Sequence, residues 1–160
     1  MIHQPTILLV EDNDADAKLT VSAFRHAKIT NPLIRARDGV EALDYLFGQG
    51  QYAGDISDIP AMMLLDLNLP KLDGLAVLKA IRADERTKSL STVILLSSIH
   101  DKERLEAFEY LAASYMVKPV NYDDFVVVAR QFGLEWMALG TERTLVLRPK
   151  SNPEPEHFGI

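Results

Sequence analysis

Cysteine is absent from this chain of 160 residues, so no disulfide bond and no thiolate metal site can form. Such a composition fits a reducing cytoplasm, the compartment we expect. No apolar run approaches the roughly 20 residues of a membrane-spanning helix, and the N-terminus lacks a basic region followed by an apolar one. We therefore expect neither a membrane anchor nor a signal peptide.

Positive charge is also scarce, with 17 lysine and arginine residues against 23 acidic ones and a formal charge of −6. A nucleic-acid-binding surface needs clustered basic side chains, so this composition argues against a nucleic-acid partner. Internal repeats and low-complexity tracts are missing as well. A chain of this length can bury a full core as one domain by packing alone.

The stretch from Met62 to Gly74 is the most informative part of the sequence. Four apolar residues lead into Asp66, and then Asn68, Pro70 and an Asp-Gly pair interrupt the pattern. A short uninterrupted apolar run is typical of a strand buried on both faces of a parallel sheet. A charge fits such a strand at its carboxyl end, where the sheet opens into a crevice. Taken alone, Asp66 is equally well explained as the start of a turn.

Five segments with the pattern of buried strands alternate with five segments of helical periodicity. The fourth helix is marked by Leu105, Phe108 and Leu111, and the last is expected to start after its N-cap Asn121 and to run to about Leu139. This alternation predicts an α/β fold, a doubly wound parallel sheet with helices on both faces. The expected strands are Thr6–Val10, Leu33–Ala36, Met62–Leu65, Thr92–Leu96 and Ser114–Val117.

Parallel strands deliver their C-terminal residues to one edge of the sheet. Here that edge receives Glu11 and Asp12, then Asp66, Ser97 and Lys118. Two like charges about 4 Å apart repel by roughly 4 kcal/mol at an effective dielectric constant of about 20, so three carboxylates need a cation. Lys118 supplies one positive charge, and an oxygen-rich set without sulfur or histidine favours a hard divalent ion such as Mg²⁺.

Each of these residues also has a purely structural interpretation. Glu11 and Asp12 suit the positive end of the dipole of the first helix, a role that is compatible with metal binding. Lys118 alone could be a solvated residue at a strand end, although the proline that follows it argues against this. Ser97 and Ser98 are explained more simply as caps of the next helix.

Carboxylate, divalent cation, hydroxyl and ammonium together suit phosphoryl transfer to a side chain. Asp66 would attack as nucleophile and form an acyl phosphate, while the cation and Lys118 neutralise charge on the transferring oxygens. The same groups suit a phosphatase with an aspartyl-phosphate intermediate. We expect no added domain or lid that would hold a small substrate, which argues against that enzyme.

The chain resembles the receiver domain of two-component response regulators from about Thr6 to Leu139. Each motif is weak alone, but all of them in order at these spacings are specific. The resemblance implies a flavodoxin-like sheet of strand order 2-1-3-4-5 and a receiver domain over residues 1–140. The motifs that carry it are Leu8–Asp12, Asp38-Gly39, Leu64–Gly74, Ser97 and Lys118-Pro119.

The resemblance also implies what the site residues do. Asp66 is expected to accept a phosphoryl group from a partner histidine kinase, without the chain being an enzyme for other substrates. Lys118 is expected to pair with a phosphoryl oxygen. Mg²⁺ is expected to be held by Asp12, Asp66 and the backbone carbonyl of Asn68, with Glu11 acting through water.

Two further residues are expected to move when Asp66 is phosphorylated. Ser97, chosen over Ser98 by its register after the strand, would bind a phosphoryl oxygen and move toward it. Tyr115 occupies the position whose ring is expected to turn inward when that hydroxyl moves. The alternative for Tyr115 is a plain strand aromatic.

Protein binding is the expected output of this chain. The 21 residues after Leu139 are too few for a DNA-binding or enzymatic module. Residues 141–160 are predicted to be a C-terminal tail, partly disordered, in which Thr144–Leu147 could dock as a strand or cover a patch.

The last predicted helix is apolar around much of its circumference, as a helix buried on more than one side would be. We expect a homodimer through this helix, with coverage by the tail as the alternative. The inward stripe is expected to be Phe125, Val128, Ala129, Phe132 and Trp136, and the apolar residues off it are Val126, Val127, Leu134 and Met137.

Within the family, the chain is similar to the single-domain regulators paired with bacterial phytochrome-type kinases. The similar features are the loop Gly48–Pro60, the run Leu-Asp-Leu-Asn-Leu-Pro-Lys around Asp66 and Trp136 in an extended last helix. A phosphorelay intermediate that passes the phosphoryl group to a histidine phosphotransfer protein would have the same sequence. A phosphotransfer assay separates these two functions.

Overall fold

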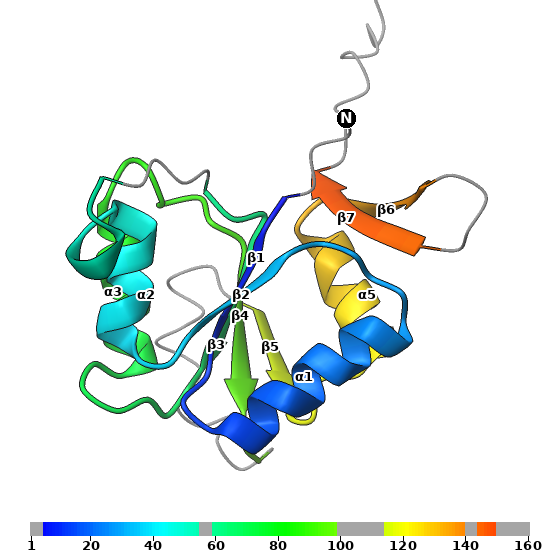
Figure 1. The fold of residues 1–160 in the computed structure, drawn as a ribbon, viewed down its shortest axis with the longest axis horizontal. Coiled ribbons are helices and arrows are strands. Elements are labelled where there is room, and N and C mark those ends of the chain that lie inside the picture. Colours follow the sequence, from blue (N-terminus) through cyan, green and yellow to red (C-terminus); the bar gives the residue numbers. More distant parts are fainter. Residues whose placement is uncertain (1–4, 55–58, 99–113, 140–143, 150–160) are drawn as a thin grey trace, which may run out of the picture.

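A computed structural model describes residues 5–54, 59–98, 114–139 and 144–149 of the chain. Its centre is a five-stranded parallel sheet of order β2-β1-β3-β4-β5 (Figure 1). The fold class and the strand order predicted from the sequence are confirmed. The strands are β1 (Ile7–Val10), β2 (Leu33–Ala36), β3 (Met62–Asp66), β4 (Thr92–Leu96) and β5 (Ser114–Val117).

Within the described part of the chain, three α-helices connect strands of this sheet and a fourth follows β5, and none of the four is long and apolar enough to span a membrane. Each begins at a side chain that accepts a hydrogen bond from a first-turn N–H group, namely Asn13, Asp38, Asp73 and Asn121. The helix expected at Leu105–Leu111 lies outside the described residues. The helices are α1 (Asp14–His26), α2 (Gly39–Phe47), α3 (Gly74–Ala83) and α5 (Tyr122–Gln131), with a 3-10 turn η1 (Gly50–Tyr52).

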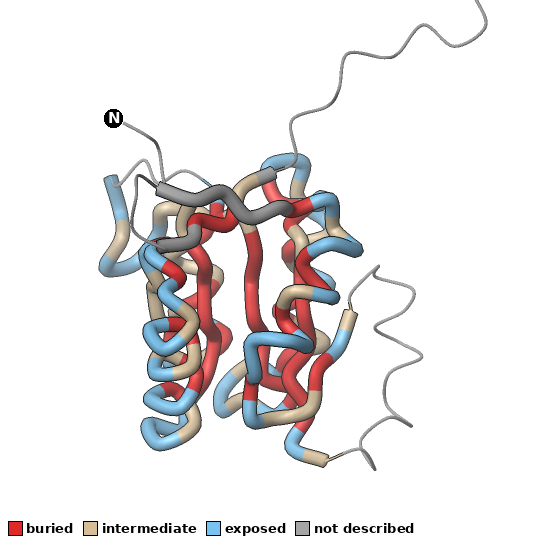
Figure 2. Tube along the Cα trace, turned by 90° about the vertical axis from the view of Figure 1, so that its right-hand side faces the viewer, coloured by how far each residue is buried: buried red, intermediate tan, exposed pale blue. Residues whose placement is uncertain are grey.

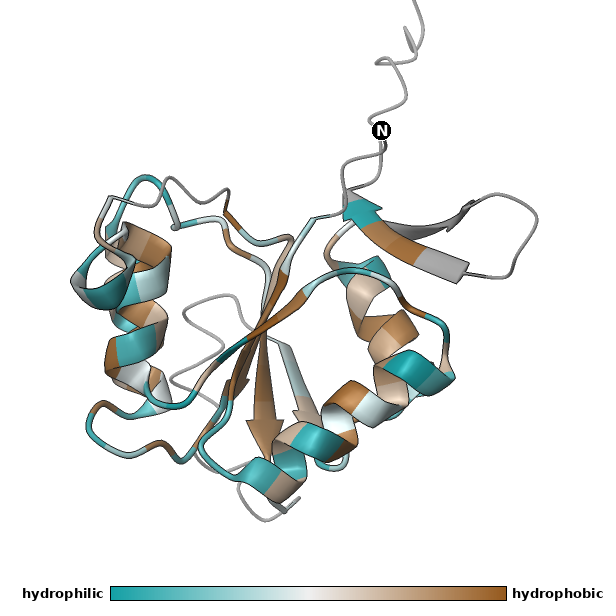
Figure 3. Cartoon of the chain, in the orientation of Figure 1, coloured by the Kyte–Doolittle hydropathy of each residue, from teal (hydrophilic) through white to brown (hydrophobic). Residues whose placement is uncertain are grey.

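Helices cover both faces of the sheet, with α1 and α5 on one side and α2 and α3 on the other (Figure 1). Successive side chains of a strand point to opposite faces, so Leu9 packs toward α1 and α5 whereas Leu8 packs toward α2 and α3. The rings of Phe24 and Phe125, 4.9 Å apart, join α1 to α5. Strands β1, β3 and β4 are buried along their whole length, whereas the helices expose one side (Figure 2). Figure 3 shows that hydrophobic and hydrophilic residues alternate along the helices.

The last helix is shorter than the sequence suggested. Helix α5 ends at Gln131, so the prediction that it runs to about Leu139 is wrong. Gly133 follows with φ of 73°, a left-handed conformation that glycine adopts without strain and that commonly ends a helix. Residues Leu134–Leu139 form strand β6, so Trp136 lies on a strand and is not part of a helical stripe.

Strand β6 pairs antiparallel with β7 (Thr144–Pro149) in a second, two-stranded sheet. Val146 and Leu147 on β7 are buried, and Leu147 joins the core on the α1 and α5 side together with Leu134. Residues Thr144–Leu147, which were expected either to dock as a strand or to cover a patch, thus lie on a strand that pairs with β6. The predicted boundary at residue 140 falls inside this hairpin.

Asn31 connects the hairpin to the main sheet. Its side-chain amide donates hydrogen bonds to the carbonyl oxygens of Leu147 and Pro5, each at 2.8 Å, and its oxygen accepts from the N–H of Leu147 at 2.7 Å. The side chain thus pairs with β7 as a neighbouring backbone would. Because Pro5 and Asn31 precede β1 and β2, the hairpin is held at the amino end of the sheet, opposite the predicted site.

Candidate functional site

The carboxyl ends of β1, β3 and β5 bring Glu11, Asp66 and Lys118 into direct contact. The Nζ atom of Lys118 lies 2.9 Å from Oε1 of Glu11 and 3.1 Å from Oδ2 of Asp66. The three residues are separated by up to 107 positions in the sequence, and only the parallel register places them side by side. Strand topology therefore assembles the cluster that the sequence predicted.

Both of these carboxylates are buried and oriented by backbone donors. Glu11 is 0% and Asp66 3% exposed. The N–H of Asn68 donates to Oδ1 of Asp66 at 3.1 Å, and the N–H of Asn13 donates to Oε2 of Glu11 at 3.3 Å. Each carboxylate therefore has one oxygen toward Lys118 and the other bonded to the loop that follows its strand.

Asp12 completes a group of acids that could hold a metal ion. One carboxylate oxygen from each of Glu11, Asp12 and Asp66 lies within 4.8 Å of the other two. Asp12 is exposed whereas the other two are buried, so the group opens to solvent on one side. An all-oxygen set with this charge suits a hard divalent cation such as Mg²⁺. The residues present fit the predicted ion.

Asp16 belongs to the cluster as well, although the sequence analysis did not include it. Its Oδ2 atom lies 3.0 Å from Nζ of Lys118, and its side chain is 38% exposed. The sequence could have indicated this role, because helix α1 begins two residues after Asp12 and its first turn therefore lies beside the site. Lys118 is thus shared among three carboxylates.

Burial and charge shift the pKa values of two of these groups. Burial is the main cause that raises the pKa of Glu11 to about 7, and Asp66 beside it adds to the rise while Lys118 opposes it. Burial alone would lower the pKa of Lys118. Hydrogen bonds to Glu11 and Asp16 and the charge of Asp66 outweigh that effect, so the pKa of Lys118 is raised above its ordinary value.

Ser97 follows β4 and shares a cavity with Lys118. The cavity has a volume of about 280 Å³ and lies between α1 and the end of β5. A larger hollow of about 600 Å³ runs along α1 and shares Leu19, Pro119 and Val120 with it. The first cavity is lined by Asp16, Leu19, Thr20, Ser97, Lys118, Pro119 and Val120.

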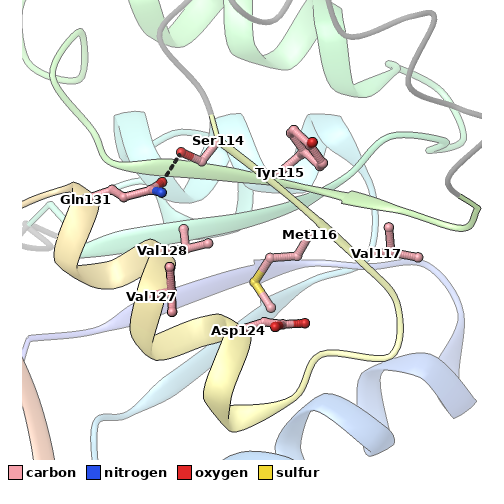
Figure 4. A pocket seen from close by; sticks show the side chains of 8 residues that line it. All are labelled: Ser114, Tyr115, Met116, Val117, Asp124, Val127, Val128 and Gln131. Carbon is pink, nitrogen blue, oxygen red and sulfur yellow. Dashed lines mark hydrogen bonds between the residues drawn. The ribbon is translucent and has the colours of Figure 1, made fainter.

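Tyr115 points away from the core in this structure. Its side chain is 43% exposed and lies on the opposite side of β5 from Met116, which faces α5 (Figure 4). The inward turn expected for this ring therefore stays a prediction, as do the movement of Ser97 and the role of the Asn68 carbonyl. Beside β5 and α5 lies a cavity of about 530 Å³, which a hydrogen bond of 3.2 Å from Ser114 to Gln131 borders.

Residues 7–130 match the response regulator receiver domain family. The chain is 37% identical over 131 residues to the probable methanogenesis regulatory protein FilR2 of Methanothrix harundinacea. The aligned region covers 82% of this chain and 83% of that protein. The chain is also 34% identical over 131 residues to response regulator Rcp1 of Synechocystis, with 82% of this chain and 88% of that protein covered.

Solved structures of response regulators also superpose on this chain. The bacteriophytochrome response regulator AtBRR superposes with a TM-score of 0.81 at 38% identity, covering 88% of this chain and 100% of that one. The Mn²⁺-bound form of Rcp1 superposes with a TM-score of 0.65 at 37% identity, covering 78% of this chain and 88% of that one.

Proposed function

This chain belongs to the response regulator receiver family, and on that basis we propose that Asp66 accepts a phosphoryl group from a sensor histidine kinase. The observation that carries the proposal is the contact of the buried Asp66 carboxylate with Lys118, beside a group of acids able to hold a cation. The phosphorylated form would then signal through the proteins that bind it.

In the proposed reaction an oxygen of Asp66 forms a bond to phosphorus, and the bond from phosphorus to the kinase histidine breaks. Lys118 is already within 3.1 Å of Asp66 and would move its ammonium group onto a phosphoryl oxygen. Ser97, on the same cavity, would donate its hydroxyl to another of these oxygens. Mg²⁺, held by Asp12, Asp66 and the Asn68 carbonyl, would neutralise developing negative charge.

The proposal is tested with acetyl phosphate as a small-molecule donor and intact-mass measurement. We expect one added phosphoryl group per chain when Mg²⁺ is present, and none when the cation is chelated, because the acidic site cannot take up an anion without it. Asp66→Asn is expected to abolish the adduct, whereas Asp123→Asn, an exposed acid on α5, should leave it unchanged. An adduct that persists in Asp66→Asn would refute the assignment.

The raised pKa of Glu11 predicts that divalent-cation binding depends on pH. With a pKa of about 7, this carboxyl is about nine-tenths protonated at about pH 6 and ionised at about pH 8, and the cation needs the ionised form. Affinity for Mg²⁺ should therefore rise about tenfold over this range. Isothermal titration at both pH values measures it, and Glu11→Gln should bind more weakly and remove most of the dependence.

We place the docking surface of the kinase on the hollow beside the site. This hollow has exposed apolar side chains at its rim, Leu19 at 55% and Tyr122 at 36% exposure, and it shares residues with the cavity that holds Lys118. A donor histidine that reaches Asp66 through this cavity would bring its own domain against α1. An apolar partner helix suits such a surface.

Leu19→Glu is expected to lower the rate of phosphoryl transfer from a histidine kinase by about tenfold, because it would bury a charge in the contact. Phosphorylation by acetyl phosphate, which needs no docking surface, should change by less than about twofold. Val40→Glu, at another exposed apolar residue (44% exposed) on α2, serves as the matched control and should leave both rates unchanged. Equal losses with both donors would place the defect in the site itself.

A bacterial phytochrome is the kinase we propose, because relatives with 34–38% identity include the phytochrome-associated regulators AtBRR and RtBRR and the cyanobacterial regulator Rcp1.

The homodimer also stays a proposal. Since α5 is shorter than predicted, we assign the dimer interface to the surface where Val127 and Tyr115 flank the cavity between β5 and α5. These two residues are 57% and 43% exposed.

A further inference from the structure

Arg35 is the charged residue of strand β2, which otherwise consists of Leu33, Ile34 and Ala36. It pairs with Leu9 in the register of β1 and β2, so its side chain lies on the face of the sheet that α1 covers. Only 24% of this side chain is exposed. A guanidinium group that is largely shielded from water needs partners, and its Nε and Nη1 atoms find them in the loop that carries the acidic site.

Two hydrogen bonds tie Arg35 to this loop. Its Nε atom donates to the backbone carbonyl oxygen of Glu11 at 2.9 Å, and its Nη1 atom lies 2.8 Å from Oδ1 of Asp14. The N–H of Glu11 donates to the carbonyl of Ala36 at 3.0 Å. This bond from Glu11 to Ala36 is the last backbone hydrogen bond between β1 and β2. The guanidinium group of Arg35 adds one further hydrogen bond beyond it, to the carbonyl oxygen of Glu11.

The bonded atoms lie where β1 turns into helix α1. Glu11 and Asp12 occupy that turn, and Asn13 caps the helix, so the loop is held at its helical end by the cap and at its strand end by Arg35. We propose that Arg35 is a positioning residue that fixes the Glu11–Asp14 backbone and thereby sets the affinity of the acidic group for a divalent cation. This inference rests on the proposed function of that group as a cation site.

The sign of the effect separates positioning from simple charge. Removing a positive charge beside an acidic group should tighten the binding of a cation, because one source of repulsion is lost. Loss of a group that orients the ligands should weaken it, and groups that orient metal ligands typically contribute about tenfold to a hundredfold in affinity. The two explanations therefore predict opposite shifts in the dissociation constant.

The test measures Mg²⁺ binding to the full chain by isothermal titration. Arg35→Met is expected to raise the dissociation constant about tenfold, near the lower end of that range, because Arg35 bonds the backbone of Glu11 and not a group that binds the cation directly. Arg35→Lys, which keeps the charge and can make one of the two bonds, should recover part of this loss. Arg37→Met removes an exposed arginine two residues along the chain and should bind Mg²⁺ as the wild type does, or slightly tighter.

A second readout excludes a general loss of stability. Phosphorylation of Arg35→Met by acetyl phosphate should return to the wild-type rate at saturating Mg²⁺, since only the affinity for the cation is altered. Ile81→Val, a mild core substitution far from this loop in the sequence, should leave the dissociation constant unchanged. Unchanged or tighter binding by Arg35→Met would overturn the inference, whereas failure of the wild type to bind Mg²⁺ would instead refute the cation site.

Discussion

Lys118→Met is expected to lower the free energy of unfolding of the cation-free protein by about 3 kcal/mol near neutral pH, measured by urea denaturation. The wild-type ammonium group lies within 3.1 Å of Glu11, Asp16 and Asp66, and only 13% of the Lys118 side chain is exposed. Methionine fills a similar volume but leaves the buried carboxylates without a counter-charge. Repulsion between them, and not a cavity, is then the source of the loss.

Three conditions should reduce this loss if the electrostatic explanation is right. Saturating Mg²⁺ should restore stability, because the cation replaces the missing charge. Lowering the pH below about 6 should do the same, since the raised pKa of Glu11 means that this group takes up a proton first. The double variant Lys118→Met, Asp66→Asn should be more stable than Lys118→Met alone. A loss that none of these changes reduces would point to packing instead.

Asn31→Ala is expected to lower the free energy of unfolding by about 3 kcal/mol, because it removes three hydrogen bonds from a residue that is only 6% exposed. The N–H and carbonyl of Leu147 would be left buried without their partner. Urea denaturation measures the loss, and hydrogen exchange at the Leu147 amide should show that β7 loses protection before the five-stranded sheet does.

A helix cap provides the comparison for this variant. Asn121→Ala removes the cap of α5 and should lower stability by about 1 kcal/mol without changing exchange at Leu147. The phosphoryl adduct on Asp66 should still form in Asn31→Ala, since the hairpin lies at the other end of the sheet. If Asn31→Ala were no more damaging than Asn121→Ala, the hairpin would contribute little to the fold.

Much of the architecture could be predicted from local patterns in the sequence. The buried apolar runs around Leu8, Leu64 and Ile94, separated by helical periodicity, suffice for a parallel sheet because no other arrangement covers both faces of such strands. The same pattern located Asp66 and Lys118 at strand ends. The strand order came with the family resemblance, since alternation alone leaves several orders open.

The error at the C-terminus has an equally local cause. Residues after Gln131 remain apolar, and apolar periodicity over a few residues does not distinguish a helix from a strand. Gly133 was the available signal for the end of the helix. What makes the following residues a strand is their partner β7, which begins at Thr144 and could not be inferred from the residues of β6 themselves.

The amino-acid sequence by itself determined the sheet, the carboxyl edge at which acids and Lys118 meet, and the composition that excludes disulfides and thiolate metal sites. Only the tertiary structure decided that Asp16 shares Lys118, that Arg35 holds the backbone of Glu11 and that Asn31 holds β7. The physical reason is the same in all three cases. Hydrogen bonds between residues 24 or more positions apart depend on how whole elements pack, and the periodicity within one element does not indicate them.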